Sequence, residues 1–223
     1  MPHTADSTPR RRWSRRKQAR PAEIVAAALE LFAERGFAAT RLDDVAARAG
    51  VSKGTLYLYF DSKEELFKAV VRESIVPNLA RIEALLAHFE GPTSELIRTM
   101  LETIGTVVTT TRIGALPKLV IAEAGNFPDI ARFYLEEVIH RGLGVIEAVL
   151  KRGIARGEFR DFDVGLSVRA VIAPVVLLAI WKNSFERFEA EPIDARAYLA
   201  NHLDILMRGI AAPGAAPEAK QRA

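Results

Sequence analysis

The sequence predicts an all-α protein of about nine helices, and three observations lead to this prediction. Apolar residues recur at the three- and four-residue spacing of an amphipathic helix from about Pro21 to Ile210. No segment alternates apolar and polar residues between hairpin turns, as a half-buried strand would. The chain has 223 residues, of which 49% are apolar and 26% charged, so it is long enough to bury a sizeable core and has a soluble, globular composition.

The first helix is expected from about Pro21 to Gly36. Proline suits the first turn of a helix, and glycine suits its C-terminal stop. The apolar residues between them fall on one helical face: Ile24, Ala27, Ala28, Leu31 and Phe32.

Two short helices follow the first. Thr40 opens a sequence with the spacing of a capping box, with Asp43 in the fourth place, and Gly50 ends the helix that it starts. Ser52 is suited to cap a third helix, which we expect over residues 53–60.

Longer helices make up the rest of the chain. A second capping box, Ser62-Lys63-Glu64-Glu65, opens a fourth helix that Pro77 is expected to kink or end. Breaks rich in Gly, Pro, Asn and Asp then separate five helices, expected over residues 93–111, 115–124, 128–155, 163–189 and 194–211. The longest apolar run, Ala170 to Trp181, is shorter than the about 20 residues that span a membrane, so we expect a buried helix there.

The positive charge of the protein is concentrated at its N-terminus. Residues 1–20 carry a net charge of +6, whereas the other 203 residues carry −3. A basic tail favours an anionic partner such as nucleic acid, although a merely solvated terminus has the same composition. We expect residues 1–17 to form a disordered basic arm and residues 212–223, rich in Ala and Pro, to form a disordered tail.

Residues 41–60 have the organisation of a helix-turn-helix, in which a first helix braces a second one that reads DNA bases. On the second helix, Leu56 and Phe60 share one face and are expected to pack inward. The opposite side carries residues that can approach a base edge, a thymine methyl group or a phosphate: Gly54, Thr55 and Leu58.

Phosphate contacts are expected from the residues around this second helix. The hydroxyl groups of Tyr57 and Tyr59 flank the inward face, and Lys53 and Lys63 stand on either side of the segment. Spacing alone leaves a second interpretation open, because paired tyrosines on a short helix are often core residues. The two lysines would then be ordinary solvated side chains.

The segment from Val45 to Leu66, VAARAGVSKGTLYLYFDSKEEL, closely resembles the DNA-binding segment of the TetR/AcrR family of bacterial repressors. Upstream, ALELFAERGF from Ala28 to Phe37, together with Thr40, resembles that family's first helix and the loop after it. The resemblance covers about residues 18–78. It implies a homodimer with an operator-binding domain at residues 18–78 and an effector-binding and dimerisation domain at residues 79–211.

Position by position, the resemblance implies DNA contacts from nine residues. They are Arg41, Ser52, Lys53, Gly54, Thr55, Tyr57, Leu58, Tyr59 and Lys63. Leu42 and Leu58 depart from the residue types common in the family, which bears on a phosphate contact at Leu42 and on the operator sequence at Leu58.

The C-terminal part resembles a subset of AcrR-like regulators in the segments LVIAEA from Leu119, NFPDIARFY from Asn126 and GEFR from Gly157. This resemblance implies a small apolar or amphipathic effector, bound in a cavity between the middle helices. Expected apolar lining residues are Phe89, Met100, Ile104, Val108, Phe133, Val138, Val176 and Trp181, and expected polar anchors are Arg112, His140 and Asn183.

The family resemblance also implies that the last two helices form a four-helix bundle with those of a second copy. Candidate seam residues are Val171, Val175, Leu178, Leu203, Leu206 and Ile210. For each of them, burial within a single chain is an equally open interpretation.

Other chemistry finds no support in the sequence. The absence of cysteine excludes disulfides and thiolate ligands, and the four histidines lack metal-ligand spacing. No phosphate-binding lysine loop and no nucleophile elbow is present. We therefore expect no cofactor, no metal and no enzymatic activity.

The predicted function is that of a cytoplasmic transcriptional regulator, a repressor released from a palindromic operator by its effector. Its expected partners are double-stranded DNA, a small molecule and a second copy of the chain, with no membrane. A helical ligand-binding module without specific DNA function is the main alternative, and a small helical enzyme is a weaker one.

Overall fold

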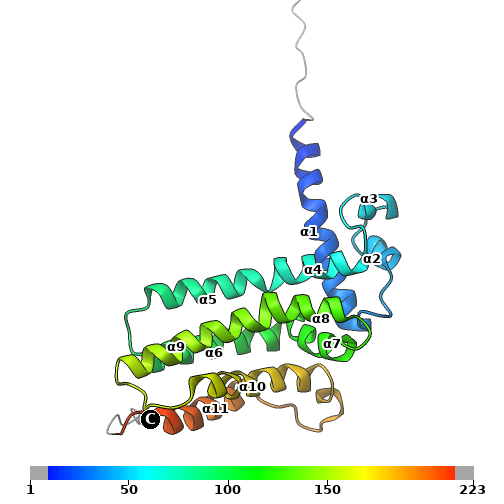
Figure 1. Cartoon of the computed structure of the whole chain (residues 1–223). Coiled ribbons are helices and arrows are strands. Elements are labelled where there is room, and N and C mark those ends of the chain that lie inside the picture. The colour runs from blue at the N-terminus through cyan, green and yellow to red at the C-terminus, as the bar shows by residue number, and fades with distance from the viewer. Residues whose placement is uncertain (1–9, 214–223) are drawn as a thin grey trace, which may run out of the picture. The chain divides into compact units, whose positions relative to one another are not determined.

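The computed structural model describes residues 10–213, with side chains described from residue 21 onward (Figure 1). Every regular element in this range is helical, apart from one isolated bridge between Phe159 and Ala211, so the predicted all-α class is confirmed. The α-helices are α1 (Arg10–Arg35), α2 (Leu42–Arg48), α3 (Lys53–Tyr57), α4 (Lys63–Ser74), α5 (Val76–His88), α6 (Thr93–Thr110), α7 (Leu116–Glu123), α8 (Pro128–Tyr134), α9 (Arg141–Ala155), α10 (Val164–Lys182) and α11 (Ala195–Ile210).

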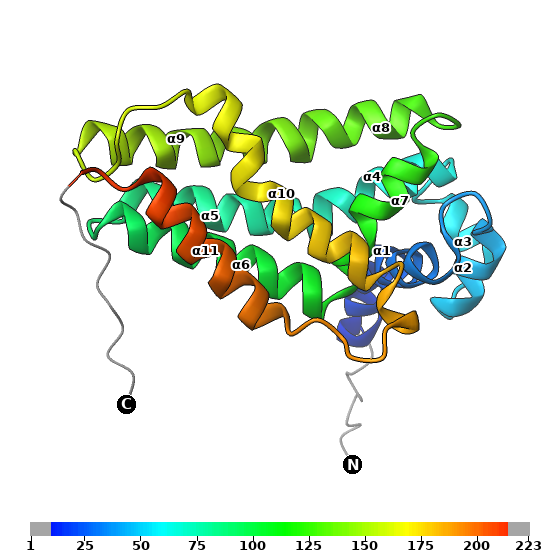
Figure 2. The same ribbon diagram turned by 90° about the horizontal axis from the view of Figure 1, so that it is seen from below.

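The difference from nine helices lies in two places where a predicted helix is subdivided. The predicted fourth helix is divided at Ile75 into α4 and α5, which agrees with the proline at position 77. The predicted helix over 128–155 becomes α8 and α9, joined by the π-helical segment Leu135–His140. In Figures 1 and 2, α8, the π-helical segment and α9 form one nearly continuous rod.

The chain divides into two compact units, residues 1–73 and residues 74–223. We call them the N-terminal unit and the C-terminal unit. The expected boundary between residues 78 and 79 falls inside α5, a few residues after the observed division.

The beginning of the chain differs from the expectation. Residues 10–17, expected to be disordered, belong to α1, and residues 1–9 lie outside the described range. Arginine, lysine, glutamine and alanine are good helix formers, so the helix propagates backwards from its packed portion. Pro21 consequently lies inside α1 and not in its first turn.

The expected tail is described only in its first two residues. The backbone N–H of Ala212 donates to the carbonyl of Glu158, 3.1 Å away, and residues 214–223 lie outside the described range.

The core of the N-terminal unit is built around three aromatic rings. Phe32 of α1, Phe37 of the following loop and Phe67 of α4 are fully buried, with ring centroids 5.4 to 6.0 Å apart. Arg48 of α2 adds ion pairs to Glu30 and Glu34 of α1, at 2.9 and 3.1 Å. These contacts fix α2 and α4 against α1.

The expected helix caps are confirmed at two sites and wrong at a third. The hydroxyl oxygens of Ser52 and Ser62 accept backbone hydrogen bonds from Thr55 and Glu65, both at 3.1 Å, as N-caps do. The buried hydroxyl of Thr40 instead donates to the carbonyl of Gly36 at 2.7 Å. Thr40 therefore satisfies a free carbonyl at the end of α1, and α2 starts one residue later than the capping box predicted.

In the C-terminal unit, α10 packs against α6, α7, α9 and α11 (Figure 2). Val168, Val171, Val175 and Leu178 form its buried face. With 19 residues, α10 is long and apolar enough to cross a bilayer, but 28% of its most apolar stretch is buried inside the unit. The expectation of a buried helix thus holds for one face of α10, and the opposite face is exposed.

This packing corrects the expected dimer seam. Five of its six residues are buried within the single chain, so they form intramolecular core: Val171, Val175, Leu178, Leu203 and Ile210. Leu206 is half-buried against the same core. The helical spacing identified apolar faces on both helices, but it could not assign the face that packs inward.

An ion pair joins α5 to α9 across the C-terminal unit. The guanidinium of Arg141 donates two hydrogen bonds to the Glu83 carboxylate, both at 2.6 Å. These bonds lower the pKa of Glu83, although partial burial acts in the opposite direction. The charged form of Glu83 therefore contributes to the stability of the folded unit.

We predict that Glu83→Gln lowers the free energy of unfolding by about 0.5 kcal/mol at neutral pH, because the pair is about one-third exposed. The pKa of Glu83 is lower in the folded state than its unfolded value of about 4.3. The stabilisation is thus present above that value and lost as the pH falls through the folded-state pKa. Urea denaturation of both proteins across this range tests the prediction.

The matched control is Glu147→Gln, which removes an exposed pair within a single helix. A difference between wild type and Glu83→Gln that stays constant down to acidic pH would contradict the prediction.

Candidate nucleic-acid interface and ligand cavity

The N-terminal unit presents a helix-turn-helix formed by α2, a short turn and α3. Gly50 in the turn has a φ of +67°, a conformation that glycine adopts without steric cost. Ser52 then caps α3, which ends at Tyr57, three residues before the expected end. The chain continues in a turn in which the N–H groups of Tyr59 and Phe60 both donate to the carbonyl of Leu56, each at 3.0 Å.

The exposure of the α3 side chains decides between the two interpretations of the tyrosines. Leu56 and Phe60 are buried, as predicted, and anchor the segment. Tyr57, Leu58 and Tyr59 are 42%, 81% and 38% exposed. The core-aromatic interpretation is therefore wrong, and these three side chains form one outward surface, which we call the α3 surface.

The small residues of the predicted contact set are partly engaged within the unit. The hydroxyl groups of Ser52 and Thr55 lie 2.9 Å apart and hydrogen-bond each other. Gly54 is exposed between them on the first turn of α3. Arg41 is exposed at the N-cap of α2. All four lie in or beside the helix-turn-helix.

Lys53 is exposed, but its ammonium group is already paired with a carboxylate. Its ammonium group lies 2.9 Å from the carboxylate of Asp43 in α2 and 5.9 Å from the centre of the Tyr57 ring. The hydrogen bond with Asp43 raises the pKa of Lys53, so the side chain stays charged. A phosphate at this position would compete with Asp43 for the ammonium group.

Lys63 has a structural role that spacing did not predict. Its ammonium donates to the carbonyls of Phe37, Ala38 and Thr40, at 2.7, 3.0 and 3.1 Å, and lies 4.5 Å from the centre of the Phe37 ring. An ammonium has three donors, and these bonds use all of them. The expected phosphate contact by Lys63 is therefore corrected: this lysine holds the loop between α1 and α2.

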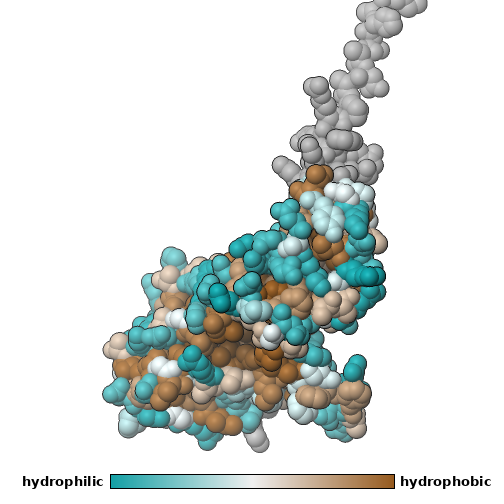
Figure 3. Space-filling view, turned by 45° about the vertical axis from the view of Figure 1, so that its right-hand side comes forward, coloured by the Kyte–Doolittle hydropathy of each residue, from teal (hydrophilic) through white to brown (hydrophobic). Residues whose placement is uncertain are grey.

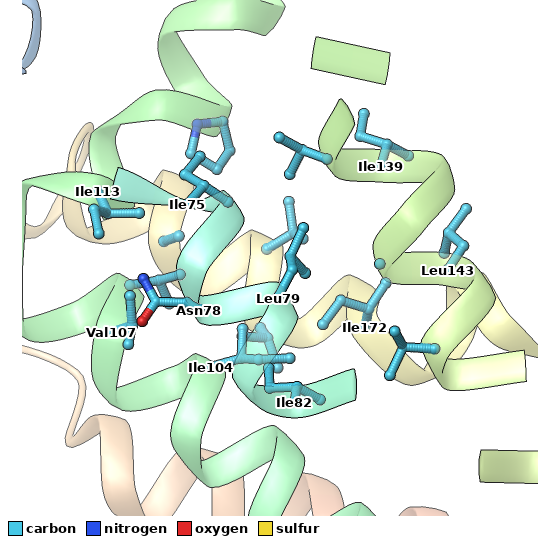
Figure 4. Close-up of a pocket in the computed structure, with 18 of the residues that line it drawn as sticks. Ile75, Asn78, Leu79, Ile82, Ile104, Val107, Ile113, Ile139, Leu143 and Ile172 are labelled. Atoms are coloured by element: carbon cyan, nitrogen blue, oxygen red, sulfur yellow. The ribbon is translucent and has the colours of Figure 1, made fainter. Parts of the chain in front are cut away.

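A cavity of about 300 Å³ lies inside the C-terminal unit and is partly open to solvent. Residues from α5, α6, α7, α8, α9 and α10 surround it, and their side chains are nearly all hydrocarbon. Figure 4 shows Leu79 and Ile82, Ile104 and Val107, and Ile139 and Leu143 on different sides of this space. In Figure 3, apolar side chains gather around a hollow in the surface of this unit. The volume suits a small organic molecule.

Five of the eleven expected effector residues line the cavity: Met100, Ile104, Val108, Val138 and Val176. The other six lie outside its wall: Phe89, Arg112, Phe133, His140, Trp181 and Asn183. The guanidinium of Arg152 lies 5.5 Å from the centre of the Phe89 ring, and the rings of Trp181 and Phe185 lie 5.0 Å apart in a tilted arrangement. Asn183 donates to the carbonyl of Ala179, and its own carbonyl accepts from Lys118. Arg112 and His140 are exposed.

The sequence interpretation missed most of the wall. Missed residues include Ile75, Asn78, Leu79, Ile82, Tyr134, Ile139, Leu143 and Ile172. On α5, the apolar spacing was visible, but nothing marked that face as facing a void. On α8, Tyr134 and not its neighbour Phe133 lines the cavity. The π-helical segment that follows widens one turn and so rotates later wall residues such as Leu143 relative to a regular helix.

Comparison with known proteins agrees with both halves of this arrangement. The family model for bacterial regulatory proteins of the tetR family matches residues 24–70, and the model for a tetracyclin repressor-like C-terminal domain matches residues 90–195. The HTH-type transcriptional repressor KstR2 of Rhodococcus jostii is 30% identical over 207 residues, which are 88% of this chain and 94% of that protein.

Two solved structures share the fold. The ketosteroid transcriptional regulator KstR2 of Mycobacterium tuberculosis is 26% identical, with a TM-score of 0.66, covering 87% of this chain and 96% of the other. The transcriptional regulator FadR of Bacillus subtilis, in complex with stearoyl-CoA, is 21% identical, with a TM-score of 0.67, covering 85% and 98%.

An exposed helix-turn-helix in one unit and an apolar cavity in the other define a DNA-binding, ligand-responsive transcriptional regulator. The sequence matches over both units make the assignment specific. The chain belongs to the TetR family of bacterial regulatory proteins.

We predict that Lys63→Met lowers the free energy of unfolding of the protein by about 2 kcal/mol, because three carbonyls of the α1–α2 loop lose a charged donor. Chemical denaturation of the full chain measures this. Lys53→Met is the matched control, because it removes only an exposed ion pair in the same unit. Equal stability of the two variants would contradict the structural role of Lys63.

Proposed function

We propose that this protein is a homodimeric repressor that leaves a palindromic operator when an apolar effector enters the cavity. The observation that carries the proposal is the α3 surface: an exposed leucine between two exposed tyrosines, at the end of α3 and in the turn after it, where Leu56 and Phe60 are buried. Its relatives are transcriptional regulators, and we infer that it acts in the cytoplasm by binding and not by catalysis.

The DNA contacts that we propose come from the helix-turn-helix and its edges. They are Arg41, Lys53, Gly54, Thr55, Tyr57, Leu58 and Tyr59, with Ser52 holding Thr55 in place. Leu58 suits a thymine methyl group, and the tyrosine hydroxyls suit phosphates. Residues 21–70 carry a net charge of −2, so the affinity of this segment depends on where individual groups point. The basic residues before Pro21 add a sequence-independent attraction to DNA.

The exposed face of α10 supports dimerisation through the last two helices. Leu166, Ala170, Ala173 and Leu177 are exposed at spacings of four, three and four residues, which places them on one side of the helix. Ile205 of α11 is also exposed. An apolar stripe of this kind on a helix requires a partner surface, and a second copy supplies the same stripe by twofold symmetry.

A dimer presents two α3 surfaces related by twofold symmetry. This predicts an operator with two inverted half-sites, separated by one helical turn of DNA or a small multiple of it. The position of Ile75 supports coupling between the effector and the operator. It lines the cavity and directly follows the last residue of α4. An effector that displaces Ile75 would favour a conformer in which the α3 surfaces of the two subunits have a different separation. By linkage, operator DNA must then weaken effector binding by the same factor.

We predict that the protein protects a palindrome in the DNA upstream of its own gene. Tyr57→Phe should weaken this binding about tenfold, the equivalent of about 1.4 kcal/mol, because a phosphate contact loses its hydroxyl donor. Footprinting and fluorescence anisotropy at moderate salt measure both effects. Tyr198→Phe, on α11, is the matched control and should bind like wild type.

Unchanged affinity of Tyr57→Phe would remove this residue from the contact set. The absence of any saturable protection would favour the alternative, a ligand-binding module without specific DNA function.

We predict that Leu177→Glu converts the dimer to a monomer, because the substitution places a charge at an apolar position that is 53% exposed in the single chain. Sedimentation analysis measures the mass. Leu58→Glu introduces the same change on the α3 surface and should leave the dimer intact while abolishing operator binding. Dimeric Leu177→Glu protein would place the interface elsewhere.

A further inference from the structure

The cavity wall contains no side chain that carries a charge. Among its 24 residues are no Asp, Glu, Lys, Arg or His, and three side chains carry polar atoms: Asn78, Thr103 and Tyr134. A charged group that entered this space would lose its hydration without gaining a counter-ion. The wall therefore selects for an uncharged ligand.

Two of the three polar side chains are already hydrogen-bonded to nearby residues of the chain. The amide of Asn78 donates to the carbonyl of Ser74 at 2.7 Å, and its oxygen accepts from Arg81 at 3.1 Å. The hydroxyl of Thr103 donates to the carbonyl of Thr99 at 2.7 Å. Neither side chain needs a ligand to satisfy its main hydrogen bond.

Tyr134 differs from both. It is 6% exposed, and its hydroxyl makes no hydrogen bond with any of the residues that the structure describes. Burial raises the pKa of this hydroxyl well above its usual range, so the group stays protonated and remains a donor. Tyr134 is thus the polar side chain of the wall that keeps a donor available, and a ligand oxygen in the cavity would supply its partner.

We propose that the part of the effector inside the cavity is an uncharged hydrocarbon with a carbonyl or hydroxyl oxygen that accepts a hydrogen bond from Tyr134. This inference rests on the proposed function and specifies its effector. It makes Tyr134 a specificity-determining residue, because an effector without such an oxygen leaves the tyrosine donor unsatisfied, and a carboxylate enters without a positive partner.

The same buried chemistry can come from two sources. One is a free ketone or alcohol that the cavity encloses entirely. The other is the acyl part of a larger thioester or ester, whose polar group stays outside, since the cavity is partly open. Both place a neutral carbonyl or hydroxyl oxygen on a hydrocarbon chain or ring.

Isothermal titration of the full-length protein with four probes tests this inference. Dodecan-2-one and progesterone are neutral ketones, dodecanoyl-CoA carries its carbonyl in a thioester, and dodecanoate is the charged counterpart of the linear ketone. We expect at least one of the three carbonyl compounds to bind wild type, and dodecanoate to bind at least tenfold more weakly than that compound. Binding of the thioester but not of the ketones would identify the second source.

The Tyr134→Phe variant tests the anchor with almost no change in shape. Its affinity for the carbonyl compound should fall about tenfold, whereas Tyr198→Phe, outside the cavity wall, should bind like wild type. The inference is overturned if none of the carbonyl compounds binds, if dodecanoate binds as tightly, or if Tyr134→Phe binds the carbonyl compound unchanged.

Operator binding without effector separates this inference from the proposed function. Tyr134→Phe should bind operator DNA like wild type. If wild type itself did not bind operator DNA, the proposed repressor function would be refuted. The titrations would still decide the chemistry of the cavity.

Discussion

The α3 surface depends on a helix that is too short to be stable by itself. Helix α3 has five residues, too few for a helix to persist in water. Its position therefore depends on tertiary contacts and on its N-cap. Leu56 and Phe60 are buried beneath it, and Ser52 caps its first turn. Because one face supplies all of the anchoring, the other face is free to be apolar and aromatic, and yet exposed.

Lys63 and the ring cluster of Phe32, Phe37 and Phe67 form the support for this arrangement. The loop after α1 has few backbone partners of its own, and Lys63 satisfies three of its carbonyls with one charged group. The charge of Lys63 thus stabilises the fold that supports the α3 surface. Net charge alone therefore does not predict where this protein binds an anion, because each charged group acts according to what it contacts.

The C-terminal unit follows the opposite principle, since it keeps charge away from its interior. Hydrocarbon side chains from six helices surround the cavity, and the ion pair of Glu83 with Arg141 lies between α5 and α9. Helix α10 is apolar on two sides, one buried in the core and the other exposed. An all-round apolar helix is expected where both sides are covered, and we attribute the exposed side to the dimer.

The sequence by itself determined the all-α class, the helix-turn-helix and two of the three serine and threonine caps, because these depend on local spacing and on the chemistry of single residues. The short-range pattern also determined which residues of the segment 53–60 are buried, since Leu56 and Phe60 are four residues apart.

Only the tertiary structure decided which apolar face of α10 packs inward, which residues surround the cavity, and that Thr40 and Lys63 hydrogen-bond to carbonyls near the end of α1. Each of these depends on groups that are distant in sequence or on a single π-helical turn that shifts the register. Apolar residues at helical spacing look the same in sequence whether they meet a core, a cavity or a second chain, because the hydrophobic effect has no direction.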